Sequence, residues 1–173
     1  MNITIIYGAT RPGNYGQFVA AAINNITAKN FSNINLKVIS PKNFTIPYDG
    51  AKIKEYTQLV EHTDAFIVVV SEYNHGYPGM LKSLMDLEFE NYFGKPVLVT
   101  VLSDGPFGGA RGVEAFVNVL KAYKMFVLGN DILINNVDKK FSKEGVLLDS
   151  TLPDYIIKSV TELILLAKKP NQG

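Results

Sequence analysis

Residues 3–17, ITIIYGATRPGNYGQ, decide the fold class of this chain. A short apolar run, typical of a buried strand, passes into a glycine-bearing loop and then into a helical pattern. In such a unit the backbone N–H groups at the start of the helix, and the positive end of its dipole, face one spot that suits a phosphate. Arg11 lies in the middle of the loop, and its planar guanidinium matches phosphate oxygens. The alternative is an ordinary strand-to-helix turn with Arg11 as a solvated surface charge.

The placement of arginine favours the phosphate interpretation. Of the 17 basic residues only Arg11 and Arg111 are arginines, and all others are lysines. Both arginines stand in glycine-bearing segments that precede a predicted helix, GATRPGN and SDGPFGGARG. Rigid bidentate recognition is more useful at such positions than general solubility.

Composition limits the class of protein. With 173 residues, 47% of them apolar, we expect one domain spanning residues 1–173 around one sizeable core. A net charge of +1 with interspersed signs offers no basic surface for nucleic acid. The first strand leaves no room for a signal peptide, and no apolar run approaches the ~20 residues that span a bilayer. We therefore expect a soluble, cytoplasmic protein with no nucleic-acid and no membrane partner.

The chain contains no cysteine, which excludes disulfides, thiolate catalysis and thiolate metal sites. Any redox chemistry must then belong to a bound cofactor. His62 and His75 are the only histidines, too few for a histidine-based metal cluster. We expect no metal.

Apolar runs alternate with helical patterns along the chain. The predicted strands are Ile3–Tyr7, Leu36–Ile39, Ala65–Val70, Val97–Leu102 and Met125–Leu128. The predicted helices are Gln17–Thr27, Ile53–His62, Gly79–Tyr92, Gly112–Lys124 and Pro153–Lys168, the last capped by Ser150 or Thr151. Residues 40–50 and 129–150 are expected to be loops, the second with room for a strand at Ile132–Ile134. Because three strands are nearly unbroken apolar runs, we expect a parallel sheet covered by helices on both faces.

In an open sheet of this type, ligands bind beyond the carboxyl ends of the strands, so the loops after the first, third and fourth strands share one crevice. The loop after the third strand, SEYNHGYPGMLKSLMD (71–86), concentrates amides, aromatics and turn formers. The loop after the fourth, SDGPFGGARG (103–112), is rich in glycine, which lets backbone approach a flat ligand closely. A planar, partly apolar ligand with a phosphate fits all three loops, and flavin mononucleotide (FMN) is the obvious candidate.

These three segments, in this order and spacing, resemble the NADPH-dependent FMN reductase family, which includes quinone reductases and azoreductases. The resemblance runs from the first strand to about residue 124. It implies a flavodoxin-like three-layer α/β sandwich with a five-stranded parallel sheet in the order 2-1-3-4-5. It also implies bound FMN, NADPH or NADH as co-substrate, and reduction of a small acceptor. Ping-pong kinetics follow if both substrates must use one face of the flavin. Hydride chemistry at the flavin N5 needs no catalytic side chain.

The resemblance also implies a set of site residues. Around the FMN phosphate it places Thr10, Arg11, Asn14, Tyr15 and Gln17. Along the ribityl chain and ring edge it places Glu72, Tyr73, Asn74 and His75. From the position of the loop alone, we also expect a backbone N–H of the Tyr73–Gly76 region near the flavin. On the other side of the ring it places Ser103, Gly105, Gly108 and Gly109.

Three positions depart from the family pattern. Ala9 stands where serine is usual, Asn14 replaces a second hydroxyl residue, and Ser71 replaces a proline. Thr10 and the Asn14 amide can supply the hydrogen bonds that the first two changes remove, whereas Ser71 bears on the conformation of its loop.

Several of these residues have a second interpretation. His75 is either a solvated turn residue or a neighbour of the nicotinamide or acceptor. Glu72 is more readily explained as a helix cap or ion-pair partner than as a general base. Tyr77 and Phe107 either cover the flavin or contact another subunit. Arg111 either binds phosphates of the nicotinamide dinucleotide or stabilises the start of its helix.

The predicted helix Gly79–Tyr92 and its next residue carry more apolar side chains than one sheet-facing stripe needs. These residues are Leu81, Leu84, Met85, Leu87, Phe89, Tyr92 and Phe93. The surplus suggests a homodimer or tetramer, and a wider buried face within the monomer is the alternative.

Single residues exclude two other classes of protein. A low-molecular-weight tyrosine phosphatase needs a cysteine, and a phosphoacceptor receiver domain needs an aspartate where this chain has Ser71. The remaining alternative is a non-enzymatic FMN-binding electron carrier or redox-responsive interaction protein. Electron-carrier flavodoxins are usually strongly acidic, and the near-neutral charge favours the enzyme.

Overall fold

A parallel sheet forms the centre of the computed structural model, which describes residues 1–169. Its strands are β1 (Asn2–Tyr7), β2 (Asn35–Ile39), β3 (Ala65–Ser71), β4 (Pro96–Leu102), β5 (Phe126–Val127) and β6 (Ile132–Ile134). The order is β2-β1-β3-β4-β5, and β6 also pairs with β4. In the register, Ile3 of β1 stands between Leu36 and Ala65. This order confirms the expected topology.

The outer edge of β4 is covered by two short strands in place of one. β5 pairs with Pro96 and Val97, and β6 pairs with the far half of β4, Thr100–Leu102. The expected strand Met125–Leu128 is therefore shorter than predicted, and the strand at Ile132–Ile134 is confirmed. Together, β5 and β6 fill the fifth position of the sheet as one interrupted strand.

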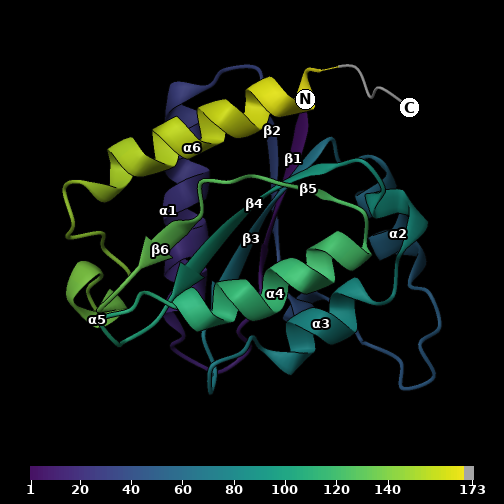
Figure 1. Cartoon of the computed structure of the whole chain (residues 1–173), viewed down its shortest axis with the longest axis horizontal. Helices are drawn as coiled ribbons and strands as arrows, with labels where there is room; N and C mark the ends of the chain where they lie inside the picture. The colour runs from purple at the N-terminus through teal and green to yellow at the C-terminus, as the bar shows by residue number, and fades with distance from the viewer. Residues whose placement is uncertain (170–173) are drawn as a thin grey trace.

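Helices cover both faces of the sheet, as predicted (Figure 1). One face carries α1 (Tyr15–Asn30) and α6 (Leu152–Ala167), and the other carries α2 (Lys54–Glu61), α3 (Gly79–Met85) and α4 (Ala110–Ala122). All seven residues of β3 are buried, because its side chains alternate between the two helical layers. The segment 129–150 is not only a loop, since it holds β6 and the short helix α5 (Val137–Lys140). A single 3-10 turn, η1 (Pro41–Asn43), interrupts the predicted loop 40–50.

The predicted helix Gly79–Tyr92 is wrong in its second half. The helix ends at Met85, and a separate 3-10 turn, η2 (Glu90–Tyr92), follows. Tight backbone hydrogen bonds from Leu87 to Leu84 and from Glu88 to Met85 end the α-helix and turn both side chains inward. Glu88 is only 1% exposed, and its carboxylate accepts a hydrogen bond from Lys52 at 2.9 Å.

This change also explains most of the apolar surplus of the segment. Leu81, Leu84, Met85, Leu87 and Tyr92 are buried in the monomer, whereas Phe89 is 47% exposed. The core of one chain therefore accounts for most of these side chains. No helix within residues 1–169 is both long enough and apolar enough to cross a membrane.

Candidate functional site

The loops that follow β1, β3 and β4 meet at the carboxyl end of the sheet. The guanidinium carbon of Arg11 lies 4.7 Å from the ring centre of Tyr73, which joins the first loop to the second. The N–H of Glu72 donates to the carbonyl of Leu102 at 2.9 Å, which joins the second loop to the third. Between them lies a cavity of about 280 Å³ lined by Arg11, Pro12, Gly13, Asn14, Tyr15, Ser71, Glu72, Tyr73, Leu102, Ser103, Asp104 and Val137.

The first loop leaves several N–H groups free at the start of α1. Asn14 caps the helix, because its Oδ1 accepts the N–H of Gln17 at 3.0 Å. Within residues 1–169 the N–H groups of Tyr15 and Gly16 have no protein partner. Gly13 stands beside them with a positive φ of 67° and no atom within 4 Å of where a Cβ would lie. The loop is thus an open cradle of donors at the positive end of a 16-residue helix.

Asn14 and Gln17, which were predicted to lie around the phosphate, form hydrogen bonds within the loop itself. The amide nitrogen of Asn14 donates to the carbonyl of Arg11 at 2.7 Å while its oxygen holds Gln17, so both ends of the side-chain amide are engaged. The backbone N–H of Gln17 is likewise taken. Thr10 is partly buried and does not line the cavity. Of the predicted phosphate residues, Arg11, Asn14 and Tyr15 line it.

Residues Tyr73–Gly76 form a tight turn. The N–H of Tyr73 donates to the carbonyl of Gly76 at 3.1 Å, and the reverse bond is 2.9 Å. The central residues Asn74 and His75 both have positive φ, 50° and 66°, as in a type I′ turn. This conformation costs free energy for residues other than glycine, and such strain concentrates at binding sites. Among residues 1–169 no acceptor is found for the N–H groups of Asn74 and His75.

Glu72 acts as a helix cap. Its Oε2 accepts the N–H of Gly112, in the first turn of α4, at 3.3 Å. A Cβ on Gly112 would lie 3.1 Å from the carbonyl oxygen of Gly76, so α4 contacts the Tyr73–Gly76 turn closely. This geometry agrees with the capping interpretation of Glu72.

The glycines after β4 approach the protein itself rather than open space. A Cβ on Gly108 would lie 3.2 Å from Cβ of Leu133, and one on Gly109 only 2.2 Å from Cγ1 of Val101. Both glycines are buried and outside the cavity lining, as is the partly buried Gly105, whose carbonyl accepts the Ser103 hydroxyl at 3.3 Å. Of the four predicted residues on this side, Ser103 alone lines the cavity.

Tyr77, Phe107 and Arg111, predicted to contact the flavin or the dinucleotide, separate into two groups. Tyr77 is partly buried and contacts Phe116 of α4 edge-to-face at 5.1 Å, so its ring packs against the core. Phe107 is 66% exposed, and the guanidinium carbon of Arg111 lies 5.3 Å from its ring centre. Arg111 Nη1 is also 3.3 Å from Nε2 of His75. Phe107, Arg111 and His75 thus form one exposed cluster beside the turn.

Comparison with known proteins agrees with this geometry. Residues 1–139 match the family described as NADPH-dependent FMN reductase. The chain belongs to this family. It is 34% identical to the NAD(P)H-dependent FMN reductase of Saccharomyces cerevisiae over 82 residues, which are 47% of this chain and 42% of the yeast protein. It is 25% identical to the quinone reductase of Escherichia coli over 181 residues, 93% of this chain and 92% of that protein.

Solved structures of similar proteins show the same fold. The flavoenzyme NAD(P)H:(acceptor) oxidoreductase FerB from Paracoccus denitrificans has a TM-score of 0.79 at 17% identity, over 96% of this chain and 97% of that one. The flavodoxin, WrbA-like protein from Agrobacterium tumefaciens has a TM-score of 0.67 at 11% identity, over 98% and 99% of the two chains. These likenesses establish the flavodoxin-like fold. The family and the names of its relatives indicate an oxidoreductase that uses FMN and NAD(P)H.

The residues at the carboxyl end of the sheet fit a phosphate-bearing flavin. The cradle offers Arg11 together with the N–H groups of Tyr15 and Gly16, donors that an anion needs and that no described residue occupies. Leu102 and Val137 supply apolar lining, and Ser103 and Asp104 supply polar atoms. This combination of a cationic end and a mixed wall suits FMN.

Sequence reasoning missed five lining residues, Pro12, Gly13, Leu102, Asp104 and Val137, and gave Ser71 no site role. Leu102 and Asp104 adjoin Ser103, so the end of β4 already indicated them. Val137 could not be found, because it comes from α5 in a segment predicted as loop.

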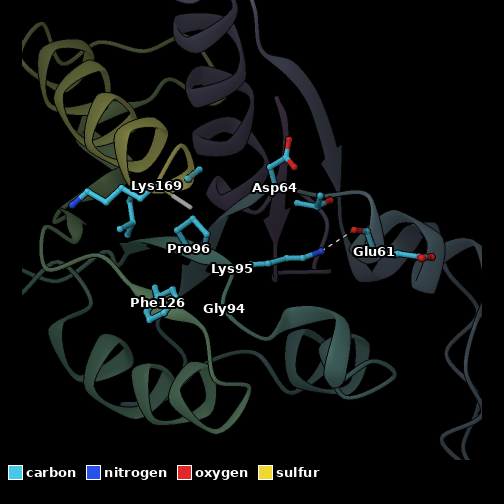
Figure 2. A pocket seen from close by; sticks show the side chains of 10 residues that line it. Glu61, Asp64, Gly94, Lys95, Pro96, Phe126 and Lys169 are labelled. Carbon is cyan, nitrogen blue, oxygen red and sulfur yellow. Dashed lines mark hydrogen bonds between the residues drawn. The ribbon is translucent and has the colours of Figure 1, made fainter. Parts of the chain in front are cut away.

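A larger hollow of about 610 Å³ lies at the opposite end of the sheet, where β4 begins (Figure 2). Lys95 reaches across it, and its ammonium donates to the carbonyl of Glu61 at 2.9 Å. Burial lowers the pKa of Lys95, which is nevertheless engaged with the end of α2. Asp64 is engaged too, since its Oδ2 accepts the N–H of Asn2 at 2.7 Å. Lys95 and Asp64 thus already have protein partners, unlike the donors at the start of α1.

Proposed function

We propose that this protein holds FMN in the crevice between the β1, β3 and β4 loops and reduces small acceptors, such as quinones, azo compounds or free flavins, with NADPH or NADH. The observation that supports it is the meeting of these loops around a cavity whose cationic end has unpaired donors, in a chain of the FMN reductase family. FMN, when bound, accepts a hydride from the nicotinamide and passes two electrons to the acceptor.

In this proposal the side chains bind and orient, and none acts as acid, base or nucleophile. Arg11 and the first N–H groups of α1 hold the phosphate, and Tyr73 stacks against Arg11 to fix it. The N–H groups of Asn74 and His75 would favour a negative charge on a flavin bound beside the turn. Glu72, Asn14 and the Gly108–Gly109 pair hold the loops in shape. Because one crevice serves both substrates, we expect ping-pong kinetics.

Anaerobic stopped-flow spectroscopy tests the activity. The protein is reconstituted with FMN and mixed with NADPH or NADH, then with a quinone. We expect rapid bleaching of the visible flavin band and its recovery on addition of the quinone, with parallel lines in double-reciprocal plots. A protein that binds FMN but is not bleached by either nucleotide would be the electron carrier or interaction module instead. A protein that cannot be reconstituted with FMN would contradict both.

Assembly and location are separate proposals. We infer a homodimer or tetramer, supported by large apolar side chains that remain exposed at Tyr48, Met80 and Phe89. Sedimentation equilibrium measures it, and a mass equal to one chain would refute it. A cytoplasmic location is supported by the use of NAD(P)H, an intracellular co-substrate.

A further inference from the structure

Arg111 is held in a fixed exposed position beside the crevice. It lies in the first turn of α4, with its guanidinium carbon 5.3 Å from the ring centre of Phe107. Its Nη1 meets Nε2 of His75 at 3.3 Å. The Phe107 ring therefore covers one face of the Arg111 guanidinium, and the His75 imidazole orients one of its N–H groups. Both contacts reduce the conformational freedom of the arginine side chain before a ligand binds.

The guanidinium has donors left over. Arginine carries five N–H groups, and the contact with His75 uses one of them. None of the three ion pairs within residues 1–169 includes Arg111, and the first turn of α4 contains no acidic residue. The nearby carboxylate of Glu72 accepts the N–H of Gly112 instead. A preorganised guanidinium with unused N–H donors binds a phosphate more strongly than it binds a neutral ligand.

Arg111 is separate from the cradle at the start of α1. The two arginines contact different residues of the same turn, Arg11 the ring of Tyr73 and Arg111 the imidazole of His75. Arg11 stands with the free N–H groups of α1, whereas Arg111 stands on α4 after the fourth strand. Two anion sites on either side of one turn match two phosphate-bearing molecules, FMN and the nicotinamide dinucleotide.

We propose that the Phe107–Arg111–His75 cluster binds a phosphate group of the NAD(P)H co-substrate and so favours a nucleotide hydride donor over one that has no phosphate. This inference rests on the proposed function. Arg111 supplies the positive charge and the planar set of N–H donors. Phe107 stacks on one face of the guanidinium, and His75 is a positioning residue that orients the guanidinium.

Three hydride donors test the proposal on FMN-reconstituted protein. NADPH carries a 2′-phosphate and a pyrophosphate, NADH carries the pyrophosphate alone, and 1-benzyl-1,4-dihydronicotinamide carries no phosphate. For Arg111→Met we expect KM for NADPH to rise about 10- to 100-fold with kcat little changed, and the values for the benzyl compound to stay at those of the wild type. If KM rises for NADH as well as for NADPH, Arg111 binds the pyrophosphate. If KM rises for NADPH alone, Arg111 binds the 2′-phosphate.

Matched variants and a binding measurement complete the test. Lys121→Met removes one positive charge from the exposed end of the same helix and should leave all three KM values unchanged. His75→Asn keeps a residue that tolerates positive φ and should give a smaller rise with the same donor selectivity. Calorimetric titration of the holoprotein with NADP⁺ should show the same loss of affinity in Arg111→Met without turnover.

Two results overturn the proposal. One is an equal change for all three donors, which would make Arg111 a structural residue of α4. The other is unchanged KM and unchanged NADP⁺ affinity in Arg111→Met. If the wild-type holoprotein accepts hydride from none of the donors, the proposed function itself fails, and that outcome is recognised before any variant is made.

Discussion

Gly109 shows how one residue fixes the loop after β4. It has a φ of 86°, and a Cβ there would lie 2.2 Å from Cγ1 of Val101. Gly109→Ala combines backbone strain with a collision against a buried strand, so we expect it to lower the free energy of unfolding by about 2–4 kcal/mol. Urea denaturation measures this. Gly129→Ala, where no atom lies within 4 Å, should change it by less than about 1 kcal/mol, and equal losses in both variants would contradict the packing argument.

Arg11 is the residue on which the proposed phosphate cradle depends. Arg11→Met removes charge-assisted hydrogen bonds, so we expect the Kd for FMN to rise about 10- to 100-fold. Quenching of flavin fluorescence measures the affinity. Lys29→Met removes the same charge at the far end of α1 and should leave the Kd unchanged. Equal weakening in the two variants would show that overall charge, and not the loop, governs binding.

At the scale of elements, Asp149 starts α6 in place of the predicted caps Ser150 and Thr151. Its Oδ1 accepts the N–H of Thr151 at 2.8 Å and of Leu152 at 3.2 Å, and its Oδ2 lies 3.0 Å from Nζ of Lys140. Thr151 occupies the cap position but makes no side-chain cap bond. The hydroxyl and N–H of Thr151, followed by Lys140, hold the pKa of Asp149 well below its usual range.

The depressed pKa of Asp149 gives a pH-dependent prediction. The ionised carboxylate stabilises the folded state above the unfolded pKa of about 4, and this contribution is lost as pH falls toward the lower folded pKa. Asp149→Ala should cost about 1–2 kcal/mol at neutral pH, and the difference from wild type should shrink below about pH 4. Thermal unfolding across pH measures it. Asp154→Ala, an exposed residue of the same first turn, is the control, and a pH-independent difference would rule out the charge as the cause.

Elements were predictable from sequence where local pattern decides them. The apolar runs at β1, β3 and β4 predicted a covered parallel sheet, and the motif resemblance supplied its order. The end of α3 was not predictable, because Asp86 and Glu88 take partners far away in sequence. The Tyr123 hydroxyl donates to Asp86 at 2.6 Å, and Lys52 reaches Glu88. Apolar periodicity contains no information about such contacts.

The candidate site was predictable to a similar extent. The sequence indicated which three loops meet, because strand ends in a parallel sheet share one edge. It did not indicate what each glycine approaches, and Gly108 proved to face Leu133 of the protein's own β6. Asn14 was expected to bind phosphate, yet its amide holds the loop together. The identity of a glycine or an asparagine in a loop does not indicate whether the residue contacts a ligand or another part of the chain.

On the scale of the whole molecule, the two ends of the sheet have different tasks. At the carboxyl end the cradle at the start of α1 leaves donors without partners, whereas at the amino end the ammonium of Lys95 already binds the end of α2. The two hydrophobic layers on either side of the sheet join these ends rigidly. A ligand at the carboxyl end should therefore order three loops without disturbing the opposite edge.

Hydrogen–deuterium exchange tests this division on the intact protein with and without FMN. Because the β1, β3 and β4 loops contact one another, bound FMN should slow exchange in residues 8–17, 71–79 and 102–112 together, with no change in residues 61–64 and 94–96. FMN at about 100 times its Kd should also raise the free energy of unfolding by about 2.7 kcal/mol, which calorimetry measures. Protection of a single loop, or of the amino end of the sheet, would mean that the three loops do not form one site.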